Sequence, residues 1–374
     1  VPQGEGQTFS INFRTNGIYY NSVSLSFMEP WLGGKRPNQF SISAWFSSQT
    51  GYSDRYYQAY QNLYNTYYSS YYYTGNSDYY QQLQESEADP DKFLRTFGIS
   101  VGYGKRLSWP DDYFAFYGDL SYQMYWMKSW PYLLVTDGKC HNLALTLQLS
   151  RSSIDNPIYT RRGSAFSISA KVTPPWSSIM GYSNSELDGM NNSEKYHLLE
   201  YYKIKFNAKV FTPLTPDGKL VLMARADFGY LGSYRQQTKS PFETFYMGGD
   251  GMSSYTSYST EYVSMRGSLT PYDYTLGRNM GYVYDKFTME LRYPITLEQR
   301  ATIWCLAFLE AGNCFSDIKD FNPFDLKRSA GLGVRIYLPM FGLLGVDWGW
   351  GFDKINGSNQ YSGSQFHFVL GQEL

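Results

Sequence analysis

The 374-residue sequence contains no long hydrophobic run. Its longest uncharged apolar stretch lies near residues 302–309, far short of the roughly 18 apolar residues that a transmembrane helix requires. Charged residues make up only 17% of the chain, against about 25% in ordinary soluble domains. These shortages exclude a helical membrane protein with many spans, a coiled coil and a charged disordered tail.

Cysteine and histidine are also scarce, with three residues of each. The cysteines Cys140, Cys305 and Cys314 imply no disulfide framework, although a Cys305–Cys314 bridge stays open. The histidines lack metal-ligand spacing, and no nucleophile elbow, Walker loop or HExxH motif occurs. The net charge of −1 gives no bias toward nucleic acid. We therefore expect no enzyme active site, no metal, no cofactor and no nucleic-acid partner.

Aromatic residues are abundant, at 19% of the chain with 38 tyrosines, and many lie in segments where apolar and polar residues alternate. In residues 203–210, an apolar residue at every even position alternates with lysine or asparagine at every odd one. In residues 287–293, every odd position is aromatic or aliphatic. A period of two is typical of a β-strand with one apolar and one polar face.

Roughly fourteen segments have this alternation. They lie near residues 7–15, 19–29, 38–49, 93–106, 112–127, 140–151, 163–174, 199–212, 219–231, 284–295, 300–311, 328–338, 343–353 and 363–373. Most are longer than the ~5–6 residues usual in a globular strand, and they match the ~9–11 residues that a tilted strand needs to cross a bilayer. The lengths therefore favour transmembrane strands.

The connections between these segments alternate between short turns and long loops, which is typical of an outer-membrane barrel. The long connections are residues 50–92, 128–139, 175–198 and 232–283. A two-sheet sandwich, the alternative, would have two edges to protect and large aromatic faces to bury. We predict an all-β fold: a transmembrane antiparallel β-barrel with long extracellular loops, integral to the outer membrane and forming a single domain over residues 1–374.

Residues 51–92 form a tyrosine-rich segment mixed with glutamine, serine and asparagine. We expect an extracellular loop with an aromatic surface, and the alternative is a docking patch for a glycan or a partner. The spacing of tyrosines in residues 54–84 is compatible with an amphipathic helix.

Seven charged residues in the last third of the chain share the polar side of the expected strands. They are Arg225, Asp227, Glu290, Arg292, Arg335, Asp347 and Asp353. Charges face lipid only at high cost, so we expect these residues to pair inside the barrel. They either line a pore, as in a porin, or bind a loop that folds inward. The candidate loop is 232–283, because a guanidinium such as that of Arg266 forks onto carboxylates and Gly267 accepts any backbone conformation.

Five short motifs in order resemble the C-terminal barrel region of the BamA-type outer-membrane β-barrel assembly factors. The loop with Gly248-Gly249, followed by Met265-Arg266-Gly267, is similar to the sixth extracellular loop of that family. The other four motifs lie in residues 289–294, 308–313, 329–353 and 365–374. Residues 29–35 resemble an early strand end in Bacteroidota-type members, so the resemblance covers essentially the whole chain.

The resemblance implies that Arg266 inserts into the barrel and pairs with Glu290 and Glu310, which locks loop 232–283. Glu310 shares its strand face with Leu306 and Phe308, which we assign to lipid. We therefore expect a bulge or a strand end to turn Glu310 inward.

The family barrel has sixteen strands, within the even-numbered range of such barrels. The resemblance thus implies that the first two strands and the periplasmic repeat domains lie upstream of this chain. It further implies that residues 363–374 form a terminal β-signal strand on one side of a lateral seam between the first and last strands. Its key residues are Phe366, Phe368, Leu370, Gly371 and Leu374.

By this resemblance, the chain folds and inserts other barrels into the outer membrane without ATP, and the seam templates the client's terminal strand. The implied partners are other subunits of a barrel-assembly complex, unfolded outer-membrane protein clients, and outer-membrane lipid with lipopolysaccharide. The alternative is a passive outer-membrane porin or channel.

Overall fold

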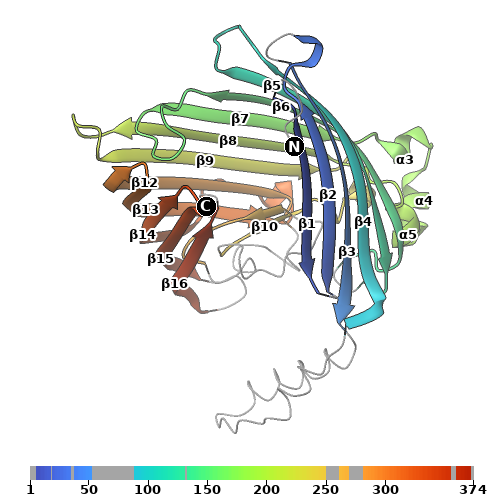
Figure 1. Ribbon diagram of the computed structural model, residues 1–374. Helices are drawn as coiled ribbons and strands as arrows, with labels where there is room; N and C mark the ends of the chain where they lie inside the picture. Colours follow the sequence, from blue (N-terminus) through green and yellow to red (C-terminus); the bar gives the residue numbers. More distant parts are fainter. Residues whose placement is uncertain are drawn as a thin grey trace. The chain divides into compact units, whose positions relative to one another are not determined.

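Long strands make up most of the fold, as the period of two predicts. The computed structural model describes residues 6–17, 19–34, 38–52, 88–130, 133–249, 261–268, 281–354 and 359–371. Within these residues, fourteen strands follow one another in chain order in one sheet, and neighbours such as β8–β9 and β12–β13 pair antiparallel (Figure 1). All fourteen expected segments are confirmed as strands, and several of the strands are longer than expected.

The strands of this sheet have the following bounds: β1 Thr8–Asn16, β2 Tyr20–Glu29, β3 Asn38–Tyr52, β4 Ala88–Arg106, β5 Phe114–Lys128, β6 Gly138–Ser152, β7 Gly163–Val172, β8 Tyr202–Pro213, β9 Val221–Gly232, β12 Val283–Glu298, β13 Ala301–Phe315, β14 Lys327–Leu338, β15 Gly342–Lys354 and β16 Tyr361–Leu370. The expected tyrosine-rich loop 51–92 is shorter than predicted, because residues 51–52 belong to β3 and residues 88–92 to β4. Its residues 53–87, which include the expected helix, lie outside the described residues.

The chain divides into two compact units. Unit 1 comprises residues 1–103, 119–145 and 173–200, and unit 2 comprises residues 104–118, 146–172 and 201–374. Unit 1 holds three short helices in the connection that the sequence analysis treated as a plain loop (Figure 1). They are α3 (Trp176–Ile179), α4 (Asn184–Gly189) and α5 (Asn192–Lys195). In the described part of the chain, no helix is long and apolar enough to cross a membrane.

Two contacts in unit 1 explain why this connection is ordered. A capping box between Ser183 and Glu186 begins α4. The Glu200 carboxylate accepts hydrogen bonds from the Ser177 backbone N–H at 2.7 Å and from the Ser177 hydroxyl at 2.8 Å. Short 3-10 turns also occur elsewhere in the chain: η1 (Leu32–Gly34), η2 (Gln236–Thr238) and η4 (Ile318–Asp320).

Strand β12 in unit 2 has two faces that differ sharply in burial. Its apolar face is open, since Phe287, Met289, Leu291 and Tyr293 are 43–48% exposed. Its polar face is covered, since Lys286, Thr288, Glu290 and Arg292 are only 2–3% exposed. This is the reverse of a water-soluble protein, where charged side chains are rarely fully buried. We call these the apolar face and the polar face of the sheet.

The expectation that Leu306 and Phe308 face lipid is wrong. Both are buried on the polar face of β13, together with Glu310. No bulge turns Glu310, because β12 and β13 pair without a shift from Val283↔Phe315 to Pro294↔Trp304. Residues 303–309 are apolar on both faces, so the period of two could not show which face meets lipid.

Leu306 and Phe308 belong to an apolar cluster that lies on the polar face of the sheet, beside its charged residues. It consists of Tyr159, Phe211, Val221, Met223, Trp304, Leu306 and Phe308. Tyr159 comes from the turn between β6 and β7, and its hydroxyl donates to the Lys219 carbonyl at 2.9 Å. Burial raises the pKa of this phenol to about 12. A short connection that the sequence analysis passed over therefore packs against the wall.

The connection between β9 and β12 contains a small parallel pair of strands that the sequence did not predict. They are β10 (Phe245–Met247) and β11 (Glu261–Val263). Gly248 and Gly249 follow β10 with φ of 131° and 65°, and Gly249 forms an antiparallel bridge with Met265. Such angles favour glycine, which explains the Gly-Gly pair of the loop motif. Residues 250–260 and 269–280 of this loop lie outside the described residues.

Candidate functional site

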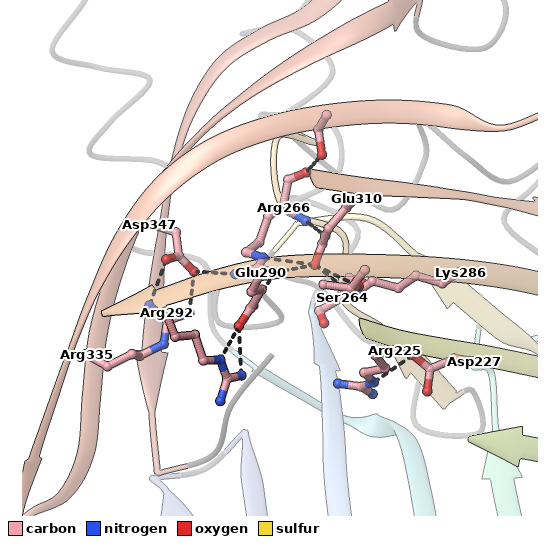
Figure 2. Close-up of polar contacts among 12 residues, drawn as sticks. Arg225, Asp227, Ser264, Arg266, Lys286, Glu290, Arg292, Glu310, Arg335 and Asp347 are labelled. Atoms are coloured by element: carbon pink, nitrogen blue, oxygen red, sulfur yellow. Dashed lines mark hydrogen bonds and ion pairs between the residues drawn. The ribbon is translucent and has the colours of Figure 1, made fainter. Parts of the chain in front are cut away.

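Arg266 lies fully buried between two glutamates of the strand wall (Figure 2). Its backbone N–H and its Nε donate to the two oxygens of Glu310 on β13, at 2.8 and 2.9 Å. Its Nη2 donates to Glu290 on β12 at 2.6 Å. The structure thus brings together the three residues that the family resemblance implies. Their role in holding loop 232–283 in place stays a prediction.

More charges surround this trio on the polar face, as Figure 2 shows. Arg292 lies 2.7 Å from Glu290, and Lys286 lies 3.4 Å from Glu310 and donates to the Ser264 carbonyl at 2.7 Å. A buried charge is costly unless it is paired and hydrogen-bonded. Each of these cations meets a carboxylate, so the network offsets the cost of burying its members.

Asp347 on β15 extends the network to a further strand. Arg335 on β14 holds both Asp347 oxygens in a bidentate pair at 2.7 Å each, and Arg266 Nη1 lies 3.6 Å away. The Arg266 guanidinium also stacks 3.9 Å over the ring of Phe308. Arg266 is bound through its guanidinium nitrogens, through the plane of its guanidinium group and through its backbone N–H. It is therefore fixed more tightly than an arginine held by a single ion pair.

Gly267, the next residue, lies directly against the strand backbone. Its φ is 81°, which favours glycine, and a Cβ there would lie 2.6 Å from the Ser329 Cβ. A Cβ at Gly349 on β15 would lie 2.7 Å from the Gly267 nitrogen. The Ser329 hydroxyl donates to the Arg266 carbonyl at 2.6 Å. Because Gly349 on the strand wall has no side chain, the backbone of Gly267 can lie directly against the wall.

His367 on β16 completes the site, because its Nε2 accepts the Gly267 N–H at 2.8 Å. Neither His367 and Ser329 nor the role of the wall glycines is predicted by the sequence patterns. One signal could have found the glycines: Gly345, Gly349 and Gly351 share a strand face with Asp347. Glycine repeated at a period of two often marks a close backbone approach.

A second group of ion pairs holds loop 232–283 at Glu243 and Glu261. Glu243 pairs with Lys171 at 2.5 Å and with Lys203 at 3.2 Å. Glu261 on β11 pairs with Lys203 at 2.8 Å and with Lys205 at 2.9 Å. We call these five residues the lysine anchor. The alternation in residues 203–210 predicts a polar face for the lysines of β8 but no partner for them.

Electrostatics keep both anchor glutamates ionised. Burial alone would raise the pKa of Glu243, but the ammonium groups of Lys171 and Lys203 outweigh it and hold the pKa at about 2. Burial also opposes ionisation of Glu261, and Lys203 and Lys205 lower its pKa in the same way. The Lys203 Nζ lies 4.5 Å over the Phe245 ring. The anchor is therefore charged at neutral pH.

The remaining expected residues that the structure describes do not contact Arg266. Arg225 and Asp227 pair with each other at 2.7 Å, and Asp353 pairs with Arg328 at 3.0 Å. On β16, the expected strand residues Phe366, Phe368 and Leu370 are 53–67% exposed on the apolar face. Gly371 follows the strand with φ of 79°, and Leu374 lies outside the described residues.

The three cysteines are free thiols. Cys140, Cys305 and Cys314 are all free, so the open Cys305–Cys314 bridge does not form. Across the described ranges, no group of three or more histidine, cysteine, aspartate or glutamate residues is placed to hold a metal ion. The closest histidines are His141 and His197, whose ring centroids lie 4.9 Å apart in unit 1.

Long antiparallel strands with an open apolar face and a buried, charge-paired polar face define an integral outer-membrane β-barrel. The chain belongs to the Omp85 superfamily, whose domain matches residues 3–374.

Solved structures show the same fold. The chain is similar to BamA from Haemophilus ducreyi lacking POTRA domains 1-3, with 15% identity and a TM-score of 0.61 over 98% of this chain and 64% of that one. It is also similar to CdiB from Escherichia coli, with 10% identity and a TM-score of 0.54 over 93% of this chain and 52% of that one. For CdiB from Acinetobacter baumannii the identity is 12% and the TM-score 0.50, over 97% and 53%. The chain thus spans 64% of the BamA structure and about half of each CdiB structure.

Proposed function

We propose that this chain is the barrel of a Bacteroidota-type outer-membrane protein assembly factor. It folds and inserts client β-barrels through a lateral seam between its first and last strands, and it does so without enzymatic chemistry. Its partners are the other subunits of a barrel-assembly complex, unfolded outer-membrane protein clients, and outer-membrane lipid with lipopolysaccharide. Membership of the Omp85 superfamily and the fold shared with BamA support this proposal.

The observation that carries the proposal is the buried Arg266 between Glu290 and Glu310. In this loop the Arg266 Nε and Nη2 are paired with two buried glutamates, and glycines on the wall let the loop backbone approach. A passive porin has no need of such a contact, because its luminal charges face water. The lock supports a role in which the position of loop 232–283 matters.

Packing on the polar face of unit 2 also argues against the porin alternative. Trp304, Leu306 and Phe308 are at most 4% exposed, and Tyr159 covers them from the turn between β6 and β7. Residues that line an aqueous channel are polar and hydrated. This part of the wall is instead dry and closely packed.

Depletion of the full-length protein in cells separates the two functions. The proposal expects several unrelated outer-membrane barrels to fall in abundance, while their unfolded forms accumulate before insertion. The same protein reconstituted in planar bilayers should show no steady conductance with a defined solute cut-off. Normal barrel insertion after depletion, together with such a conductance, would establish the porin alternative.

A further inference from the structure

The last strand of the sheet also contacts the segment that carries Arg266. His367 lies on β16, is only 3% exposed, and accepts the Gly267 N–H through Nε2 at 2.8 Å. Its neighbours in sequence, Phe366 and Phe368, point to the apolar face and are more than half exposed. His367 therefore connects β16 to the loop.

The direction of this hydrogen bond fixes the state of the imidazole. A backbone N–H can only donate, so the lone pair on Nε2 must accept. His367 is then neutral, with its proton on Nδ1. A phenyl ring of similar shape would fill the same space without an acceptor, and the buried Gly267 N–H would lose its partner. Leaving such a group unsatisfied costs more than an average hydrogen bond contributes.

Three consecutive strands hold the main chain of Arg266 and Gly267. Ser329 on β14 donates to the Arg266 carbonyl, Gly349 on β15 leaves room for the Gly267 nitrogen, and His367 on β16 accepts its proton. His367 also lies opposite Asp347 in the β15–β16 register. Asp347 is in turn held by Arg335 and faces Arg266. The docked loop thus bridges β14, β15 and the terminal strand.

We propose that His367 is a positioning residue that couples docking of residues 261–268 to the pairing of β16 with β15. When the loop is docked, the Gly267 N–H holds β16 in register through His367. When the contact is lost, β16 frays more readily from β15. Coupling between two such contacts is reciprocal, so weakening the pairing of β16 also loosens the loop. The coupling itself is independent of the proposed function. Only its biological role rests on that function, in which β16 forms one side of the lateral seam.

Amide hydrogen exchange of the full-length protein in lipid nanodiscs tests the coupling. His367→Phe should speed exchange of the Gly267 amide and of the β16 amides that pair with β15, by about tenfold, as expected for loss of one buried hydrogen bond. His367→Gln keeps a neutral side chain with an acceptor oxygen, and it should stay within about threefold of the wild type. Heat-modifiable migration on a gel confirms that each variant is a folded barrel.

Ser329→Ala tests the coupling from β14. It removes a hydrogen bond from the same stretch of loop, but from β14 rather than β16. Because docking and β16 pairing are coupled, we expect it to speed exchange in residues 261–268 and, to a smaller extent, in β16. The exposed Arg328→Ala variant is the control and should change neither. If His367→Phe leaves the β16 amides at the wild-type rate, the contact merely holds the loop and the proposal is overturned.

Arg266→Ala tests the same coupling by weakening the docked loop instead of β16. It keeps the test decisive if His367→Phe does not fold. It should speed β16 exchange, and unchanged β16 exchange would overturn the proposal. Client folding by the wild-type protein is measured separately. Coupled exchange without accelerated client folding refutes the proposed function alone, and accelerated client folding without coupled exchange refutes this inference alone.

Discussion

Glu310 binds both the backbone and the side chain of Arg266, accepting from the backbone N–H at 2.8 Å and from the side-chain Nε at 2.9 Å. A side chain alone can swing away from its partner while the backbone moves. A residue held by backbone and side chain on one carboxylate cannot move along the wall without breaking both bonds. The pair therefore fixes the position of the loop as well as the conformation of one arginine.

The first prediction concerns the charge and the shape of Arg266. Arg266→Lys keeps a cation but cannot fork between Glu290 and Glu310, so we expect nearly the same loosening of residues 261–268 as in Arg266→Ala. Removing one partner from a buried charge network costs about 3–5 kcal/mol. Protease protection and amide exchange of these residues measure the effect.

Arg328→Ala serves as the control for this change. Arg328 pairs with Asp353, but its side chain is 65% exposed. Exposed pairs contribute about 0–1 kcal/mol, so the loop should stay protected. Equal loosening in the Arg328 and Arg266 variants would show that protection reflects general stability.

The second prediction ranks the two glutamates. Glu310→Gln should loosen the loop more than Glu290→Gln, because Glu310 also binds the Arg266 backbone and Lys286. Glu290→Gln leaves these contacts in place. Exchange at the Arg266 amide is the measurement, and equal rates in the two variants would contradict the double contact.

The third prediction tests the close approach at Gly349. Gly349→Ala puts a methyl group 2.7 Å from the Gly267 nitrogen, so the loop must shift outward. Forced overpacking typically costs about 1–3 kcal/mol. Gly118→Ala on β5 is the control, because the nearest atom to its new Cβ is 3.6 Å away. Exchange in residues 261–268 should rise only in the Gly349 variant.

The fourth prediction is a pH dependence of the lysine anchor. The pKa of Glu243 falls from 4.5 to about 2 in the folded protein, because Lys171 and Lys203 outweigh its burial. A group with a lowered pKa contributes stability that is present above its unfolded value and is lost as the pH falls toward its folded value. The protection factors of amides near β10, which are corrected for the intrinsic exchange rate at each pH, should therefore fall as the pH drops from about 4.5 to about 2.

Lys203→Met should move this release to higher pH, since Glu243 keeps only one close cation. Glu243→Gln should make the pH step smaller and leave the part that Glu261 contributes, because Lys203 and Lys205 also lower the pKa of Glu261. A step that persists unchanged in Glu243→Gln would assign the pH dependence to another group.

The strand framework was predictable because its signal is local. The period of two in residues 203–210 and 287–293 marks a strand wherever one face is apolar and the other polar. The pattern failed for residues 303–309, where both faces are apolar and the packing of Tyr159 decides which is covered. The helices α3 to α5 were missed because each is only a turn or two long.

The candidate site was predictable only in its charged part. Glu290 followed from the cost of placing charges in lipid, and Arg266 from its place in a long loop. Glu310 and the pairing of the three residues came only from the family resemblance. His367 and Ser329 could not be found this way, because their role depends on where the Gly267 backbone lies in three dimensions. The lysine anchor needed the fold of β10 and β11, which no local pattern predicts.

The rate at which an unfolded outer-membrane barrel folds into liposomes containing the full-length protein tests the central claim most directly. We predict that the wild-type protein and Arg328→Ala accelerate client folding over empty liposomes, and that Arg266→Ala, although folded itself, loses most of this acceleration. Client folding that is equally fast with wild-type protein, with Arg266→Ala and with empty liposomes would contradict the proposed assembly function.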